Sequence, residues 1–502
     1  MNTSETSRSS IPGAAITATA VVLFLLIFGE LRGLMSRPLW LDEVHTALLA
    51  SEPDWRRAWA ALQCTDVHPP LHYVLAKAAL SAGMSPERAL RAVSVLSFGV
   101  LGFSLTLLLR EHGAFSGAIA VFTVLSAPVN AESSLDGRPY ALMLALSGLL
   151  AVCGVACWRQ RTGVPVTPRI GLAAVAALLC SSHYYGILAW GLVLVGIGLL
   201  AWPDWRGFIR RCWTAFAGPV ATLVWLPLLL HQRAALPVST WMERALPSQS
   251  GAVVRDVTPA LALAWLACLA VVVGVFTRRG IGLPSRQALL PVLPLAAIPV
   301  VLAAISLALQ PTMLPRYAVV TSLAFAPIAA GIVGALPRGW RAIACLGVIA
   351  AAASSLVVFG NRTRDSLTHE VERIELATAD PRTVAVFERR HDLFPILQRT
   401  PSNAGRMFFL DRSPEVLLRS TNFVRIESAM AANTRKALGW PKILVDEHLA
   451  LPTVLLVAEN NDIQRLAKRL PKYRLTFLSD RLFLAERARL ADDPAAPTSA
   501  RP

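Results

Sequence analysis

The stretch that most constrains this chain runs Leu39-Trp40-Leu41-Asp42-Glu43, just beyond the first long apolar run. Further along, the chain reads Asp66-Val67-His68-Pro69-Pro70. A carboxylate near the edge of a lipid bilayer is costly unless it is paired or functional. Two acids and a histidine on one connection therefore indicate a site. The alternative is that Asp42 and Glu43 are ordinary solvated loop charges.

The composition of the chain is that of an integral membrane protein. Hydrophobic residues make up 54% of the 502 positions, charged residues only 16%, and the mean hydropathy is +0.52. The formal charge of +16 does not form a basic stripe, because the positive residues lie between apolar runs and in the C-terminal third. Nucleic-acid binding is therefore not expected. The seven cysteines show neither a disulfide framework nor the spacing of a zinc site.

Apolar runs long enough to cross a bilayer recur through the first 360 residues. The first, Ile11 to Phe28, lacks a small-residue cleavage site before the charged stretch that follows, which indicates an anchor rather than a removed signal peptide. The other single spans are expected at 88–109, 113–130, 138–157, 212–230, 258–277, 288–309, 316–336 and 341–359.

The apolar stretch 170–202 is too long for one upright span and short for two. A polar interruption from Ser181 to Gly186 favours two. With two spans, eight of the twelve arginines between residues 203 and 360 face the cytoplasm, whereas one span would invert that ratio. The positive-inside tendency thus predicts about eleven transmembrane helices, with the N-terminus inside and the C-terminus outside.

This topology brings polar residues of several connections to the outer face of the membrane. Scattered structural charges would not be expected to gather there. The set comprises Asp42, Glu43, His68, Asp136, Arg138, His183, Tyr184 and Arg316.

The first outer connection, residues 36–87, is too long for a turn and is expected to be partly helical. Ser51-Glu52-Pro53-Asp54 is a helix start, and Trp55, Trp59 and Leu62 follow at helical spacing. The segment 71–83 is too short to cross and is expected to lie along the surface. Ser85 and Pro86 then cap and start the next span.

From about residue 361 the pattern changes to short β-type runs that alternate with helical stretches. The expected strands are 383–387, 407–410, 453–458, 475–478 and 482–485, with a helix at 461–470. The sequence thus divides into a transmembrane domain (1–360), a small α/β extracytoplasmic domain (361–489) and a disordered tail (490–502).

Several of these segments resemble the family 39 glycosyltransferases. These are GT-C membrane enzymes related to protein O-mannosyltransferases and bacterial lipid A aminoarabinose transferases. Trp40 to Glu43 followed by Asp66 to Leu71 is similar to the family's first external loop. Asp136-Gly137-Arg138-Pro139-Tyr140-Ala141-Leu142 resembles its Gln-Glu-Ala-Arg-x-Tyr-Ala-Leu stretch, with Asp for Glu and Gly for Ala. Ser182 to Tyr185 and Pro315 to Tyr317 resemble two further elements, so the likeness spans residues 10–360.

The resemblance implies a GT-C fold in a bacterial inner membrane and a specific chemistry at the outer face. Such enzymes move a sugar from a polyprenyl-phosphate carrier to an acceptor hydroxyl of a lipid, glycan or protein, here with inversion. Asp42 is the expected base, and Glu43 orients it or helps to hold a cation. Arginines suit the leaving phosphate because their planar fork donates two hydrogen bonds. The expected phosphate ligands are Arg138 and Arg316, supported by His68, Tyr140, His183 and Tyr184.

Other interpretations remain open from the sequence alone. Asp42, Glu43 and His68 could ligate a divalent cation, although no recognisable metal-site spacing is present, so the cofactor stays unknown. The arginines could be topology charges, and the tyrosines interfacial anchors. A transporter or flippase of lipid-linked glycans is the main alternative function, and an inactive scaffold a third. The chain carries few ionisable residues in the middle of its spans, which disfavours a transport pathway.

Overall fold

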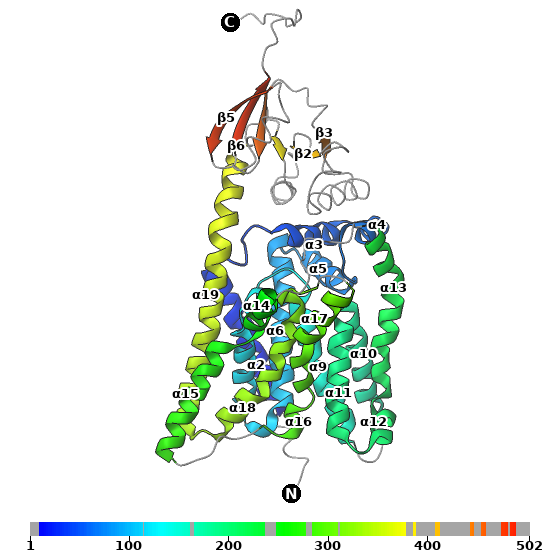
Figure 1. Cartoon of the computed structure of the whole chain (residues 1–502), viewed down its shortest axis with the longest axis vertical. Helices are drawn as coiled ribbons and strands as arrows, with labels where there is room; N and C mark the ends of the chain where they lie inside the picture. Colours follow the sequence, from blue (N-terminus) through cyan, green and yellow to red (C-terminus); the bar gives the residue numbers. More distant parts are fainter. Residues whose placement is uncertain are drawn as a thin grey trace, which may run out of the picture.

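The computed structural model describes residues 10–377, apart from 114, 161–164, 236–246, 278–283 and 310–311, together with six strands between residues 385 and 487. Most helices run along one direction, and the strands form a sheet beyond one end of this bundle (Figure 1). The chain is a multi-span α-helical membrane protein, as its sequence predicts.

Within the described residues, each of the eleven predicted spans falls in an apolar helix or helix pair. Six are long enough to cross: α2 (Ser10–Leu31), α6 (Pro86–Leu108), α9 (Tyr140–Arg159), α12 (Trp205–Cys212) with η2 (Trp213–Phe216) and α13 (Ala217–Ala235), η4 (Pro315–Phe325) with α18 (Ala326–Ala335), and residues 338–361 of α19 (Arg338–Ala377). A seventh bends by 58° between α14 (Pro247–Val257) and α15 (Ala260–Thr277). Four are shorter: α7 (Ser116–Leu125), α10 (Val166–Ser182), α11 (Gly186–Ala201), and η3 (Leu293–Ala297) with α17 (Ile298–Ala308). The remaining short helices are η1 (Arg110–His112), α8 (Pro128–Ser134) and α16 (Arg286–Leu289).

The long apolar stretch 170–202 folds as two helices, as the arginine distribution predicts. Helix α10 ends at Ser182, His183 is extended (φ −159°, ψ 142°), and α11 starts at Gly186. A Cβ atom at Gly186 would lie 2.4 Å from the carbonyl oxygen of Leu179, so only glycine allows the two helices to approach this closely. The turn between them lies at the same end of the bundle as the first outer connection (Figure 1).

Three short helices form the first outer connection and lie across the end of the bundle (Figure 1). They are α3 (Leu41–Ser51), α4 (Trp55–Thr65) and α5 (Leu71–Ser81). The expected caps are present: the Asp54 carboxylate accepts from the amide of Arg56, and the Ser85 hydroxyl accepts from that of Arg88. Helix α3 was not expected, and it places the acidic pair in a first helical turn rather than in a loop.

The C-terminal strands form one sheet in the order β3-β2-β1-β4-β6-β5. The bounds are β1 (Ala385–Phe387), β2 (Met407–Asp411), β3 (Lys442–Val445), β4 (Thr453–Val457), β5 (Tyr473–Ser479) and β6 (Leu482–Arg487). The first four strands pair in parallel, while β6 pairs antiparallel with β4 and β5. All five expected strands are present, and β3 is additional. The predicted helix 461–470 and tail 490–502 lie outside the described residues.

Helix α19 is 40 residues long and continues past the domain boundary expected at residue 360. It is tied to the segment after α2 by three contacts. Arg32 donates to the side chain of Asn361, the Arg37 guanidinium lies 5.1 Å from the centre of the Phe359 ring, and Gly360 lies beside Leu34. The helix thus runs without a break from the membrane bundle to Ala377.

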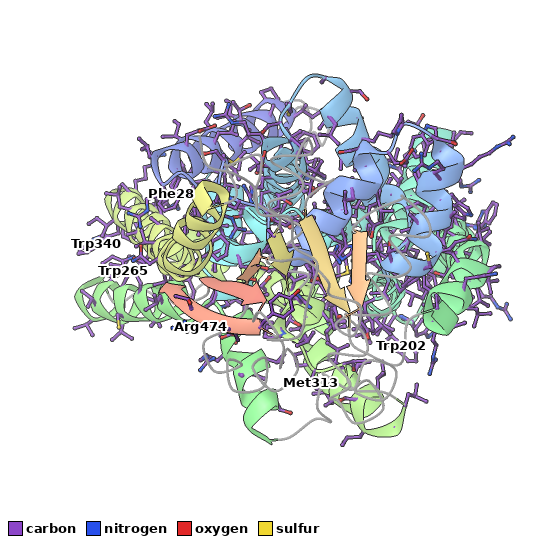
Figure 2. The ribbon with its side chains drawn as sticks, turned by 90° about the horizontal axis from the view of Figure 1, so that it is seen from above. Phe28, Trp202, Trp265, Met313, Trp340 and Arg474 are labelled. Carbon is purple, nitrogen blue, oxygen red and sulfur yellow. The ribbon has the colours of Figure 1, made fainter. Side chains whose placement is uncertain are left out.

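The topology predicts that the sheet faces the exterior. In a chain whose native cysteines are replaced by alanine, Arg474→Cys places a thiol on an exposed position of β5 (Arg474 is labelled in Figure 2), and β5 lies beyond the outer end of the bundle in Figure 1. A membrane-impermeant maleimide should label it in intact spheroplasts, because no bilayer separates the reagent from the thiol. Arg210→Cys, exposed on α12 at the opposite end, is the matched control and should be labelled only after permeabilisation. The reverse pattern would contradict the topology.

Candidate functional site

Glu43 forms a buried ion pair beneath the start of α3. Its carboxylate lies 2.9 Å from Arg91 and 3.6 Å from Arg37, and none of the three side chains exceeds 8% exposure. The amides of Gly137 and Trp40 donate to its two oxygens at 2.7 and 3.2 Å. Burial raises the pKa of Glu43, but the two guanidiniums and the Gly137 amide more than offset this, so its pKa lies below its ordinary value. Glu43 is therefore ionised, and both of its carboxylate oxygens accept hydrogen bonds from the protein.

Gly137 allows the connection after α8 to approach this ion pair. A Cβ atom there would lie 2.7 Å from the Leu90 Cβ and 3.2 Å from a carboxylate oxygen of Glu43. The neighbouring Asp136 carboxyl accepts from the Trp40 indole nitrogen at 2.9 Å. Burial and the nearby acids, chiefly Glu43, raise the pKa of Asp136 to about 8. Asp136 is thus mostly protonated at neutral pH, and it fixes the Trp40 ring.

Asp66 and Arg138 form a second buried ion pair. Two guanidinium nitrogens of Arg138 lie 2.9 and 3.3 Å from the two oxygens of Asp66, a bidentate arrangement. One of these nitrogens also donates to the Asp42 carbonyl and the Thr46 hydroxyl, each at 2.9 Å. Burial raises the pKa of Asp66, but Arg138 and His68 hold it well below its usual range. Arg138 therefore ties α3 to the loop that carries Asp66.

This geometry changes the interpretation of Arg138. We expected its fork to bind a phosphate, but both terminal nitrogens are bonded to protein acceptors and the side chain is only 4% exposed. The contacts favour a positioning role. Glu43 likewise has neither exposed surface nor an unused oxygen, which favours the orienting function over direct contact with a ligand.

Asp42 and Arg316 are the charged pair that opens to the surface. Their side chains are 29% and 25% exposed, and a guanidinium nitrogen lies 3.3 Å from a carboxylate oxygen. The rings of Trp40, Tyr140 and Tyr317 surround the Arg316 guanidinium, with centres 5.8 to 5.9 Å away. The two residues come from connections 274 positions apart, and the fold joins them at the outer end of the bundle.

Imidazole and phenol rings pack beside this pair. The His68 ring centre lies 4.9 Å from that of His183 and 6.3 Å from that of Tyr140. His68 Nδ1 lies 2.8 Å from Asp66 Oδ1. Burial and Arg138 lower the pKa of His68 although Asp66 raises it, so the ring is neutral at physiological pH.

Tyr184 does not join these rings, contrary to expectation. Its hydroxyl donates to the side-chain oxygen of Gln232 at 2.8 Å. The Gln232 amide in turn donates to the carbonyls of Leu62 and His68 at 3.0 and 3.2 Å. Tyr185 packs on the cluster instead, with its ring centre 4.9 Å from that of Tyr317. Tyr184 and Gln232 thus hold the loop that carries Asp66 and His68.

Sequence reasoning did not assign roles to several residues of the site. Some lie within the quoted motifs, next to residues that were assigned. Gln232 is different, because it lies beyond the predicted span 212–230, between His231 and Arg233, and an amide at that place carries no signal of its own. The unassigned residues are Trp40, Asp66, Arg91, Tyr185, Gln232 and Tyr317.

The cation site suggested by the sequence is not assembled. In the part of the chain that the structure describes, no group of three or more His, Cys, Asp or Glu side chains is arranged to hold a metal ion. Glu43 is bonded to Arg91, and His68 to Asp66 and Arg138.

No protein-family model matches the sequence, and no curated protein matches it. Solved structures do match the fold. ArnT from Cupriavidus metallidurans bound to undecaprenyl phosphate aligns with a TM-score of 0.62 at 14% identity, over 93% of this chain and 97% of that one. The same protein in the apo state aligns at 0.58 and 15% identity, over 93% and 98%. The chain therefore has the GT-C fold that the sequence predicts.

The loop anchor at Gln232 gives a test of the site's construction. Gln232→Leu leaves the carbonyls of Leu62 and His68 unpaired, and each buried unpaired group costs about 1–3 kcal/mol. Hydrogen exchange of a peptide covering 62–70 should rise markedly in purified protein. Trp190→Phe is the control, because it removes a single bond from α11 to the carbonyl of Ala215. Equal exchange in both variants would show that Gln232 is not the anchor.

Proposed function

We propose that this protein is a glycosyltransferase that moves a sugar from a polyprenyl-phosphate-linked donor to an acceptor hydroxyl. The proposed setting is the outer face of a bacterial cytoplasmic membrane, with a lipid, glycan or protein as acceptor. The observation that carries the proposal is the partly exposed pair of Asp42 and Arg316 at the outer end of a GT-C fold. It is supported by the matching ArnT structure, which was solved with undecaprenyl phosphate bound.

Asp42 is the proposed general base. Its neighbours Glu43 and Asp66 are sealed in ion pairs, and Asp136 is protonated, so Asp42 is the acid of this group that can reach a substrate. Arg138 holds the Asp42 carbonyl, which fixes the backbone from which the carboxylate projects. The acceptor oxygen attacks C1 of the sugar while Asp42 takes its proton, and the configuration at C1 inverts.

Arg316 is the proposed ligand of the leaving phosphate. As the bond between C1 and the phosphate oxygen breaks, the electron pair stays on the phosphate and its negative charge grows. A guanidinium held among three aromatic rings is preorganised to stabilise that charge. Tyr140 and His183 lie beside it as further donors. His68 belongs to the same cluster, but its Nδ1 proton bonds to Asp66, so it positions the loop together with Arg138 and Tyr184.

Asp42→Asn tests the base. The variant keeps the shape of the side chain but removes proton acceptance, so turnover should fall by about two to four orders of magnitude. Binding of the lipid-linked sugar should change far less. The assay gives purified protein a pool of radiolabelled polyprenyl-phosphate sugars with membrane acceptors and follows label into product. Asp54→Asn is the control, since asparagine is an equally good helix cap. Undiminished activity in Asp42→Asn would remove the base assignment, and no transfer from any donor by the wild type would favour a transporter.

Arg316→Lys tests the phosphate contact. Lysine keeps the charge but loses the planar fork and its stacking, so donor affinity should fall by about tenfold or more. Affinity is measured as the apparent dissociation constant for undecaprenyl phosphate in detergent. Arg88→Lys, an exposed arginine paired with Glu30 near the outer end of α6, should bind like the wild type. If Arg316→Lys also binds normally, Arg316 is not a phosphate ligand.

A further inference from the structure

His183 is held rigidly at the turn between α10 and α11. Its carbonyl accepts from the Gly186 amide at 2.8 Å, and its backbone is extended. The side chain is 3% exposed. Its ring centre lies 5.4 Å from that of Tyr185, 5.5 Å from that of Tyr140 and 5.8 Å from that of Tyr317. The imidazole therefore has a fixed place among the rings beside Arg316.

The protonation of this imidazole follows from its hydrogen bonds. The backbone amide of Tyr185 donates to Nδ1 at 3.1 Å, so Nδ1 must be the unprotonated acceptor of the ring. In a neutral imidazole the proton then resides on Nε2. Nε2 is buried, and no hydrogen-bond partner for it lies among the residues that the structure describes. Within that part of the chain, the Nε2–H of His183 is thus a buried donor without an acceptor, which is costly unless a ligand supplies one.

The charges around the ring indicate which acceptor fits. Burial, His68, Arg138 and Arg316 all lower the pKa of His183, and Asp66 opposes them only weakly, so its pKa lies well below the usual value. The imidazole is therefore neutral at physiological pH. Arg138 is neutralised by Asp66, but the partly exposed guanidinium of Arg316 lies beside the same rings, and a positive charge there favours an anionic oxygen over an uncharged hydroxyl.

We propose that His183 is a neutral donor of fixed tautomer whose Nε2–H binds an oxygen of the carrier phosphate, next to Arg316. This assignment rests on the proposed function. Because the donor does not titrate near neutral pH, its contribution to phosphate binding does not change with protonation of the ring. The bond strengthens as charge develops on the leaving phosphate, and Nε2 keeps its proton throughout.

Substitution of His183 by glutamine or by asparagine tests which of the two ring nitrogens binds the ligand. A glutamine amide nitrogen reaches about as far as Nε2, whereas an asparagine amide reaches only about as far as Nδ1. His183→Gln should retain affinity for undecaprenyl phosphate within a few-fold of the wild type. His183→Asn and His183→Phe should lose about tenfold or more, the usual range for a hydrogen bond to a charged group. The ratio between His183→Gln and wild type should stay constant from pH 6 to 9.

Thermal unfolding provides a second readout that separates ligand binding from folding. In the absence of lipid, His183→Phe should unfold close to the wild-type temperature, because it removes a buried unsatisfied donor at Nε2 but also removes the acceptor of the Tyr185 amide at Nδ1. Its stabilisation by added undecaprenyl phosphate should be much smaller than that of the wild type. A variant that is destabilised without lipid but stabilised normally by it would overturn the proposal, since His183 would then be structural.

The outcomes also separate this inference from the proposed function. If the wild type does not bind undecaprenyl phosphate, both fail. If the wild type binds it and all three His183 variants bind equally well, the inference fails while the proposed function stands. If the variants lose affinity only for the sugar-linked lipid, the acceptor is a sugar oxygen and the phosphate assignment is overturned.

Discussion

The outer end of this protein depends on neutralising buried carboxylates from within the fold. Glu43 and Asp66 are shielded from water, and each has an arginine nitrogen at 2.9 Å. Removing one partner of such a pair typically costs about 3–5 kcal/mol, because the other charge stays buried without compensation. Glu43 fixes the first turn of α3, and Asp66 fixes Arg138, which binds the carbonyl of Asp42. The position of Asp42 is therefore a consequence of both ion pairs.

The same constraint divides the acids by accessibility. Glu43 and Asp66 are ionised but sealed, and Asp136 is buried and mostly protonated. Asp42 combines a carboxylate with partial exposure, at 29%. A site for proton transfer needs one accessible acid on a backbone that is held in place. Here Asp42 is the accessible acid, and the ion pairs of Glu43 and Asp66 hold its backbone. The arginines divide in the same way, with Arg138 and Arg91 buried and Arg316 partly exposed.

The sequence predicts the large features because they follow from hydrophobicity and charge, which act locally. The polar interruption from Ser181 to Gly186 and the placement of the arginines were enough to divide residues 170–202 into α10 and α11. They also put Asp42, His68, Arg138 and Arg316 at one end of the bundle. What the sequence could not predict is the direction of each side chain. Arg138 and Arg316 look alike in the sequence, because both are arginines in outer connections. Only the fold shows that Asp66, 72 residues from Arg138 in the chain, occupies the guanidinium of Arg138.

Tyr184 and Tyr185 show the same limit on prediction. The two are adjacent tyrosines in a turn, and which of them meets the rings depends on Gln232, a residue 48 positions beyond Tyr184. Helix α3 and strand β3 were missed for a different reason. Both are short, at 11 and 4 residues, and such elements depend on packing against neighbours more than on their own pattern.

Helix α19 can act as a rigid lever on the membrane bundle. At 1.5 Å per residue its 18 residues beyond Phe359 span about 27 Å, so a tilt of about 10° at Phe359 would move the end of the helix by about 5 Å. The fulcrum lies where Phe359 meets Arg37, whose guanidinium also lies 3.6 Å from Glu43. A tilt of α19 is therefore transmitted through Phe359 and Arg37 to Glu43, which fixes the start of α3.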